Sequence, residues 1–254
     1  MRSTILSSAV LASALCLCAC SNRDSADEKL NQAVNQAKQG SWQEAGKKAA
    51  ALSTAHPNTT APLLLQALAY EKAGDMDKAI DLAIKCAKMT QDDFTCLYTL
   101  GRLYSMDNQR SGEAFTILEH ALALKPADRN TLTILCNLGV KRNEPNTGKY
   151  LDQLIQQSDR DTIGNICYLK ALYLENNGKI SDAVNSMFES AKYSRNDPAL
   201  ILNAARFIDR QGREYRLKAR NLYMIFISIH QRSASPDPEL LREAKSRIQK
   251  LAVR

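Results

Sequence analysis

Residues of the same kind recur along this 254-residue chain at a spacing of 34 or 35 positions. Gly40 and Gly74 are 34 apart, as are Ala45 and Ala79, and Ala114 follows Ala79 by 35. Each recurrence places a Gly- or Asn-rich break between two stretches of helical apolar periodicity, and a small residue follows early in the second stretch. A fixed period of this length indicates stacked copies of one supersecondary unit, each covering its neighbour's apolar face. We therefore expect an all-α array of helix pairs.

The period and its punctuation resemble the tetratricopeptide repeat, a 34-residue pair of antiparallel helices. One unit keeps the family's large, small, aromatic, Ala, Ala and Pro positions, in the order Leu100, Gly101, Tyr104, Ala114, Ala121 and Pro126. The resemblance assigns residues 28–230 to about six units and implies a right-handed superhelical solenoid. The fourth unit departs from the pattern at residues 144–146, where a Gly turn is usual, and the sixth has Leu217 where Ala is expected.

Proteins of this family line a concave groove with the first helix of each unit, and the groove binds an extended peptide or a partner helix. The resemblance implies groove positions in four units: Tyr98 and Arg102 in the third, Asn137 and Lys141 in the fourth, Tyr168 and Glu175 in the fifth, and Arg206 and Arg210 in the sixth. Aromatic and cationic groups are frequent on binding surfaces. The alternative is that many of these are ordinary exposed helix residues.

Residues 1–19 read as an export signal, with a basic start and an uncharged apolar run of 13 residues. That run is shorter than the roughly 20 residues that a membrane-spanning helix needs. The letters LCAC, which end at Cys20, resemble the lipobox of bacterial lipoproteins. The resemblance implies an acylated Cys20, a polar tether over residues 20–27 and, because Ser21 follows the cysteine, an outer-membrane location facing the periplasm. The alternative is an ordinary cleaved signal with incidental cysteines.

Four further cysteines lie in the body of the chain, and an exported protein can hold disulfides. Cys86 and Cys96 flank a predicted turn between antiparallel helices, so a bridge between them is possible. Cys136 and Cys167 fall at different heights on successive first helices, which makes a second bridge less favourable. The alternative for all four is a role as small buried packing residues.

The formal net charge of +7 is concentrated at the C-terminal end. From Ala199 onward the chain has twelve Lys and Arg against five Asp and Glu. This end could contact an acidic partner, anionic wall polymers or lipid headgroups, or it could be a solvated helical surface that aids solubility. Export disfavours nucleic acid as a partner.

Two apolar patterns follow in the same region. Residues 236–254 contain an amphipathic helix that fits a C-terminal cap, although a partner-binding helix would show the same pattern. Residues 222–229, LYMIFISI, are the most apolar run of the mature chain. We expect this run to be buried on both sides, between the sixth unit's first helix and the cap, with an exposed docking site as the alternative.

The sequence has no constellation that predicts catalysis. Its three His are isolated, and the fingerprints of hydrolases, nucleotide-binding proteins and zinc enzymes are absent, so we expect no cofactor and no metal. The leading hypothesis is a non-catalytic, lipid-anchored scaffold whose partners are other envelope proteins. Lipoproteins of similar layout assist assembly of pili, secretion systems and other envelope machines. The alternatives are an envelope enzyme and a carrier for a glycan or small ligand.

Overall fold

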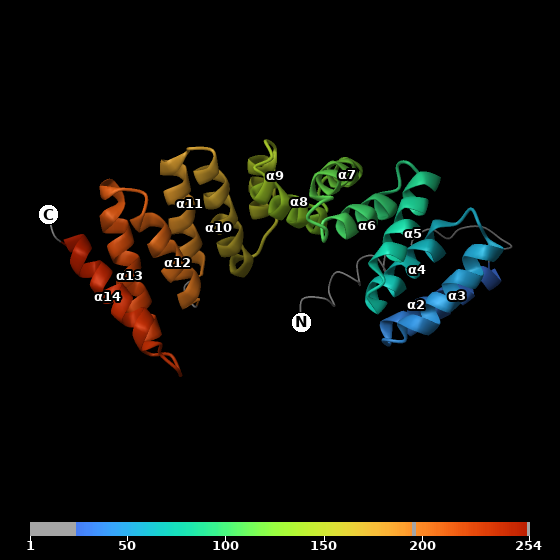
Figure 1. Cartoon of the computed structure of the whole chain (residues 1–254), viewed down its shortest axis with the longest axis horizontal. Helices are drawn as coiled ribbons and strands as arrows, with labels where there is room; N and C mark the ends of the chain where they lie inside the picture. The colour runs from blue at the N-terminus through green and yellow to red at the C-terminus, as the bar shows by residue number, and fades with distance from the viewer. Residues whose placement is uncertain (1–23, 195–196, 253–254) are drawn as a thin grey trace. The chain divides into compact units, whose positions relative to one another are not determined.

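The structure is a computed structural model that describes residues 24–194 and 197–252, and in this part it contains only helices and turns (Figure 1). Thirteen α-helices and one short 3-10 helix follow each other along these described residues. They are α2 (Asp24–Lys38), α3 (Trp42–Ala55), α4 (Thr60–Ala73), α5 (Met76–Met89), α6 (Phe94–Tyr104), α7 (Ser111–Leu124), α8 (Arg129–Arg142), α9 (Thr147–Gln156), α10 (Arg160–Asn176), α11 (Ile180–Tyr193), α12 (Pro198–Asp209), η1 (Arg213–Tyr215), α13 (Arg216–His230) and α14 (Pro238–Ala252).

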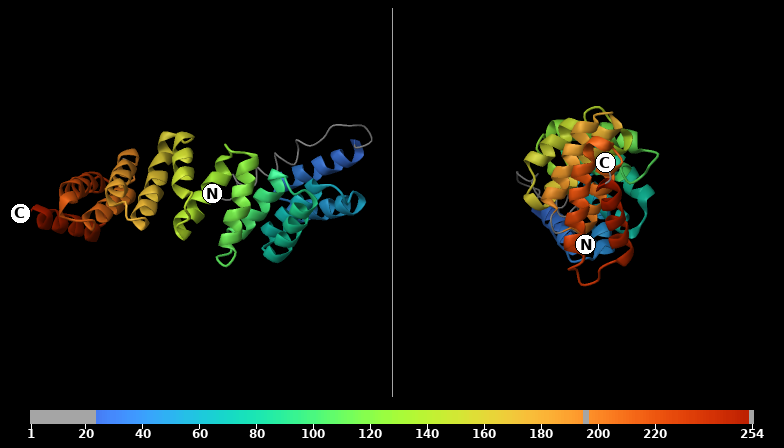
Figure 2. Two further views of the ribbon diagram at one scale, coloured as in Figure 1. Left: turned by 90° about the horizontal axis from the view of Figure 1, so that it is seen from above. Right: turned by 90° about the vertical axis from the view of Figure 1, so that its left-hand side faces the viewer.

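The helices form consecutive pairs joined by short turns. The partners α2 and α3, α4 and α5, α6 and α7, α10 and α11, and α12 and α13 lie side by side (Figure 2). Helices α8 and α9 follow between these pairs along the chain, and α14 follows the last pair and packs on α13. The predicted all-α class, built from helix pairs and a C-terminal helix, is confirmed.

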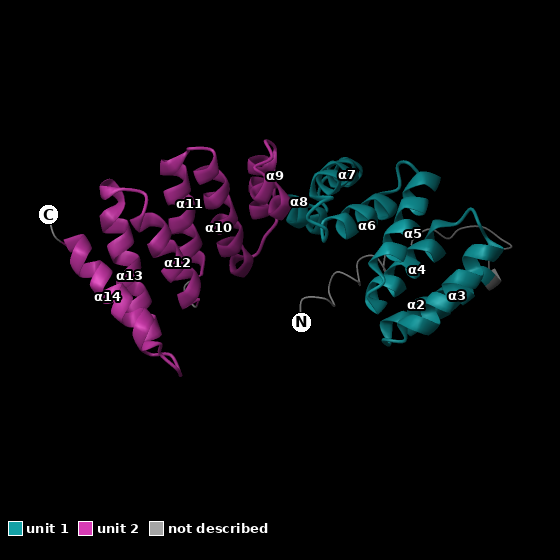
Figure 3. Cartoon of the chain, viewed as in Figure 1, with its two compact units in different colours: residues 1–135 teal, residues 136–254 magenta. Residues whose placement is uncertain are grey.

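The chain divides into two compact units, residues 1–135 and residues 136–254, with the boundary inside α8 (Figure 3). Within the first unit, Leu and Ala side chains from α2 to α7 form most of the core. The core of the second unit is a cluster centred on α11, α12 and α13, which includes Met187, Ile208 and Phe226.

An alanine occupies the fourth position of five second helices and is completely buried in each. These residues are Ala45, Ala79, Ala114, Ala183 and Ala219. A small side chain at this point lets the two helices of a pair approach closely, as the sequence predicted. The same close approach occurs at Gly101, where an added Cβ would lie 2.6 Å from Cγ of Leu118.

The sixth unit is more regular than its sequence indicates. We expected Leu217 at the small position, but η1 is inserted before α13, so the helix starts at Arg216 and Ala219 takes that position. Leu217 instead points outward, with 65% of its surface exposed. The apparent exception is therefore a shift in where the helix begins.

The turns show why these stretches end where they do. Gly74 closes α4 with φ of +84°, a left-handed conformation that favours glycine. In the fourth unit, which lacks that glycine, Asn143 adopts φ of +56°. The Oδ1 atom of Asn143 accepts a hydrogen bond of 2.7 Å from Nδ2 of Asn177. Asn143 thus adopts the positive φ that a glycine adopts in the corresponding turn of other helix pairs.

Aspartates that directly precede helices act as N-caps. The side chain of Asp93 accepts a hydrogen bond from the backbone N–H of Cys96, and that of Asp159 accepts one from Thr162. Each carboxylate satisfies a donor that the first helical turn leaves free.

The N-terminal predictions fall largely outside the described residues, which applies to the signal over residues 1–19 and to Cys20. The first described residue, Asp24, is also the first residue of α2. The last four residues of the expected tether over 20–27 are therefore helical. Asp27 and Glu28 lie in this first part of α2, where negative charge is favoured by the helix dipole.

The apolar run at 222–229 is buried on one side only, which corrects our expectation. Leu222, Tyr223 and Phe226 are buried in the core of the second unit. Met224 and Ile225 are 42% and 44% exposed. The reason is that α12 and α14 both pack on α13, as predicted, but leave the strip of its surface with Met224 and Ile225 uncovered.

Candidate binding site

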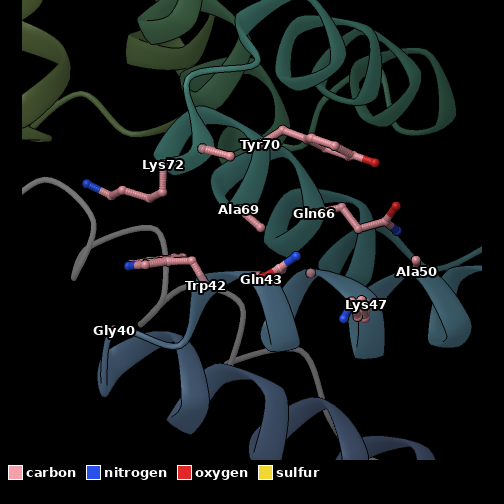
Figure 4. A pocket seen from close by; sticks show the side chains of 11 residues that line it. Gly40, Trp42, Gln43, Lys47, Ala50, Gln66, Ala69, Tyr70 and Lys72 are labelled. Atoms are coloured by element: carbon pink, nitrogen blue, oxygen red, sulfur yellow. The ribbon is translucent and has the colours of Figure 1, made fainter.

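The first compact unit, residues 1–135, contains a hollow of about 570 Å³ between α3 and α4 (Figure 4). Its small residues include Gly46 and Ala69, where the two helices come so close that an added Cβ on Gly46 would lie 2.9 Å from that of Ala69. Its larger side chains are Trp42, Gln43, Lys47, Gln66, Tyr70 and Lys72. Close helix contact at small residues thus leaves room beside them, framed by aromatic, amide and cationic groups.

Trp42, the single Trp of the chain, stands at the start of α3. The Nζ atom of Lys72, near the end of α4, lies 5.6 Å from the centroid of the Trp42 ring. This distance permits a cation–π interaction. Close by on α4, the Tyr70 ring has Nζ of Lys78 from α5 at 5.2 Å from its centroid. Each of these two aromatic rings therefore has an ammonium group beside it, and that of Lys78 is also paired with Asp75.

Hydrogen bonds hold the far side of the hollow. The Nε2 atom of Gln66 donates to the carbonyl of Ala49 at 3.3 Å and to Oγ of Ser53 at 2.7 Å, which ties α4 to α3. Lys47 is exposed and pairs with Glu44 at 3.0 Å, outside the lining. No Asp or Glu is among the residues that line the hollow. The lining thus presents the ammonium groups of Lys72 and of Lys47, the second of them paired with Glu44.

Tyr98 and Arg102 do not form the exposed groove surface that the resemblance implied. They are only 3% and 4% exposed, because α6 is buried along its whole length from Thr95 to Tyr104. Tyr98 stacks on Phe94, with ring centroids 5.7 Å apart. The two positions are part of the packed interior of the first unit.

Arg102 is bound by Glu71, an acidic residue of the preceding helix pair. Its Nη1 and Nη2 atoms donate to the two carboxylate oxygens of Glu71 at 2.7 and 2.5 Å. Burial lowers the pKa of Arg102, but the hydrogen bonds and charge of Glu71 outweigh it, so the pKa lies above the ordinary value. The hydroxyl of Tyr98 and Nε of Arg102 are buried with no hydrogen-bond partner in the described part of the chain. The ion pair of Arg102 with Glu71 joins α4 to α6.

The groove positions in the second compact unit, residues 136–254, are distributed between helix contacts and exposed surface. Arg210 is 2.8 Å from Glu175, which also accepts from Gln211, so these two predicted residues come together. Arg206 reaches Glu243 on α14 at 2.5 Å. Tyr168 is half-buried against the core, while Asn137 and Lys141 are exposed on α8.

The structure joins Cys86 and Cys96 by a disulfide, with their Cα atoms 5.5 Å apart. They lie at the end of α5 and the start of α6, on either side of the expected turn. Cys136 and Cys167 are free and buried. Burial raises the pKa of the Cys136 thiol to about 12 and also raises that of Cys167. These two thiols are thus suited to packing and poorly suited to nucleophilic chemistry.

Sequence reasoning missed the hollow between α3 and α4. Its residues lie in the first two helix pairs, whereas the predicted groove positions were taken from the third helix pair onward. A signal was present, because Trp42 stands four residues before Gly46 on the same helix face. A large aromatic residue next to a small residue on the same helix face predicts a depression in the surface above the small residue.

No described helix combines the length and apolar character that crossing a membrane requires. Among residues 24–194 and 197–252, no group of three or more His, Cys, Asp or Glu is arranged to hold a metal ion.

Comparison with known proteins identifies the fold. Residues 94–128, which span α6 and α7, match the family model described as Tetratricopeptide repeat. The chain is similar to the solved structure of YrrB, described as "a TPR protein with an unusual peptide-binding site", with a TM-score of 0.62 and 18% identity over 78% of this chain and 97% of that one. It is also similar to a MamA protein, with a TM-score of 0.59 and 17% identity over 68% and 93%.

A third similar structure is that of Naa15/Naa10 bound to HypK-THB, with a TM-score of 0.58 and 16% identity over 89% of this chain and 36% of that one. No curated protein shows a significant match. At these identities the likeness concerns the fold alone, which is that of tetratricopeptide-repeat proteins.

Proposed function

We propose that this protein is a non-catalytic scaffold that binds a segment of a partner protein in the hollow between α3 and α4. The observation that carries the proposal is the hollow's lining, in which Trp42, Lys47 and Lys72 surround small residues on a tetratricopeptide-repeat framework. Repeat arrays bind through surfaces of this kind because neighbouring helices present side chains at fixed spacing. The similar protein YrrB, which is described as having a peptide-binding site, supports a peptide as ligand.

The lining specifies the chemistry of the partner segment. The face of Trp42 offers a large apolar area at low entropic cost, and such aromatic anchors dominate binding energy at interfaces. Lys47 and Lys72 place ammonium groups at the edge of the hollow, and that of Lys47 is shared with Glu44. The best ligand is therefore a segment in which an apolar or aromatic side chain is followed by an acidic one.

We also propose that the scaffold works at the cell envelope, anchored through an acylated Cys20 to the outer membrane and facing the periplasm. The sequence of residues 1–21 supports this part of the proposal. Its partners would then be other envelope proteins, and its role would be to assist assembly of an envelope complex such as a pilus or secretion system. The lack of any recognisable catalytic motif in the sequence agrees with a scaffold.

Affinity capture from detergent-solubilised envelope tests the scaffold. Wild-type protein should retain a defined partner, and Trp42→Ala should lose it while unfolding at a similar temperature. Leu124→Ala, a change at an exposed apolar residue of α7, is the matched control and should retain the partner. Equal capture by Trp42→Ala and wild type would exclude the hollow as the binding site.

Membrane fractionation tests the anchor separately. Replacing Cys20 with Ser should move the protein from the membrane fraction to the soluble fraction. If the variant stays with the membrane, acylation at Cys20 is not what holds the protein there.

A further inference from the structure

The outward face of α13 carries three large apolar side chains that nothing in the described chain covers. Leu217 is 65% exposed, Ile225 is 44% exposed and Met224 is 42% exposed. Leu217 and Met224 are two helical turns apart, and Ile225 follows directly, so all three project from one side of the helix. We call these three residues the α13 ridge. The opposite side of α13 holds the buried residues Leu222, Tyr223 and Phe226.

Three arginines that form no ion pair within the described part of the chain flank the ridge. Arg213, Arg216 and Arg220 form no ion pair with any described residue, in contrast to Arg206 and Arg210, which are bound by Glu243 and Glu175. Nε of Arg220 is buried and has no hydrogen-bond partner among the described residues. Between residues 210 and 236 the chain has one acidic residue, Glu214, and the other charged residues are Lys and Arg. The positive charge of this end is therefore available on the same surface as the ridge.

An apolar hollow of about 360 Å³ adjoins the ridge on the side of α11. Its walls include Phe188, Leu222, Ile225 and Ile229. Lys192 also lines it and is paired with Glu189 at 3.1 Å. Ile225 belongs to both the ridge and the hollow. The apolar surface thus continues from the exposed helix face into a recess.

We propose that the α13 ridge docks onto an anionic lipid surface. Apolar side chains that project from one helix face, with arginines beside them, match the pattern of helices that lie in a membrane interface. The ridge residues would enter the headgroup region while Arg213, Arg216 and Arg220 contact lipid phosphates. This inference does not depend on the hollow between α3 and α4.

Other occupants explain the surface less well. A stable contact with a second copy buries about 1,200 Å² or more, and three partly exposed side chains are a small part of that area. Nucleic acid would use the cations but not the ridge, since phosphate contacts need no apolar anchor.

Vesicle binding tests the proposal. The chain from Ser21 onward keeps every described helix and lacks the cysteine whose acylation would itself bind lipid. We expect it to float with vesicles of phosphatidylcholine mixed with phosphatidylglycerol, and to bind vesicles of phosphatidylcholine alone at least about tenfold more weakly. High salt should weaken the binding, because screening reduces the attraction between surface charges.

Two variants and two controls locate the contact. Leu217→Ser, Met224→Ser and Ile225→Ser together should reduce vesicle binding at least about tenfold, as should Arg213→Gln, Arg216→Gln and Arg220→Gln together. Met106→Ser with Leu124→Ser changes exposed apolar residues in the first unit. Lys85→Gln, Lys88→Gln and Lys149→Gln together remove the same charge from exposed sites elsewhere. Both controls should bind like the parent chain.

Three results would overturn the proposal. The first is failure of the parent chain to bind anionic vesicles, and the second is an equal loss of binding in the controls. The third is light scattering that shows a dimer which the ridge variant dissociates, since that would assign the face to a second copy. If the ridge variant does not fold, as judged by its circular dichroism, the arginine variant decides the outcome by itself.

Discussion

Arg102 on α6 and Glu71 on α4 form a two-pronged ion pair between successive helix pairs, with side chains only 5% and 15% exposed. In the second unit, Arg206 on α12 and Glu243 on α14 are joined in a similar way, but their side chains are 42% and 37% exposed. The chain thus contains a buried and an exposed version of the same kind of contact, one between two first helices and one between a first helix and the cap.

The buried pair should be the more sensitive of the two. Arg102→Ala or Glu71→Ala should lower the free energy of unfolding by about 3 kcal/mol, because each leaves a buried charge without its partner. Glu243→Ala should cost less than about 1 kcal/mol, since water screens the exposed pair. Urea unfolding of the single variants and of the double variant Glu71→Ala with Arg102→Ala measures the coupling. Additive losses in this cycle would contradict a direct interaction.

Two buried tyrosines provide a matched comparison. Tyr98→Phe should leave stability unchanged or raise it, because the buried hydroxyl of Tyr98 has no hydrogen-bond partner in the described chain. Tyr223→Phe should cost about 1 kcal/mol, because the hydroxyl of Tyr223 donates to Asp209 at 3.2 Å. Thermal unfolding of both variants checks this order, and a greater loss in Tyr98→Phe would show that its hydroxyl has a partner after all.

The same tyrosines predict how stability changes at alkaline pH. Burial raises the pKa of both phenols to about 12, and the charge of Asp209 adds to the effect for Tyr223. Because their folded pKa values exceed the ordinary value of 10.0, their contribution to stability is complete below pH 10 and falls as the pH rises towards 12. The free energy of unfolding should therefore decline over this window, and less steeply in Tyr223→Phe. Identical slopes in wild type and variant would contradict the raised pKa.

Asp209 should hold the C-terminal helix in place. Its carboxylate is 5% exposed and lies 2.6 Å from Arg247 on α14, and it also accepts from Tyr223 on α13. Asp209→Ala should cost about 2 to 4 kcal/mol, because it leaves Arg247 and the Tyr223 hydroxyl without their acceptor. Hydrogen exchange should accelerate in α14 first. Glu239→Ala, an exposed change on the same helix, is the control, and exchange that rises equally in both variants would exclude a specific role for Asp209.

The four body cysteines should divide into two classes. After denaturation without reductant, alkylation should label Cys136 and Cys167 but not Cys86 and Cys96, which the structure joins. Before denaturation, labelling of Cys136 should be slow because its thiol is buried and its pKa is raised. Peptide mapping by mass spectrometry gives the answer, and alkylation of Cys86 and Cys96 in the unreduced sample would show that the bridge is absent.

The repeat period was sufficient to predict the fold class, because Ala79, Ala114 and Gly74 mark contacts and turns that depend on side-chain size and backbone conformation alone. The position of Leu217 was misread, since a three-residue 3-10 helix shifts the register and sequence spacing does not reveal it. Asn143 was overlooked as a turn residue because asparagine adopts the left-handed conformation less often than glycine.

The binding surface was harder to predict than the fold. Tyr98 and Arg102 were assigned from family positions, but burial depends on how neighbouring helices pack, and Glu71 is 31 residues away in sequence. The hollow beside Trp42 likewise arises from the contact between Gly46 and Ala69, which belong to different helices. A repeat period describes one helix pair at a time and does not show the space that is left between successive pairs.

Binding of a partner segment beside Trp42 can be measured by intrinsic fluorescence. Because Trp42 is the single Trp of the chain, its emission reports on this hollow alone. Titration with a Trp-free peptide from the captured partner should give a saturable shift in emission, and Lys72→Gln should weaken the affinity by about tenfold, or 1.4 kcal/mol. Binding that leaves the emission unchanged and is unaffected by Lys72→Gln, or a shift produced by an envelope glycan and not by the peptide, would contradict a peptide site in this hollow.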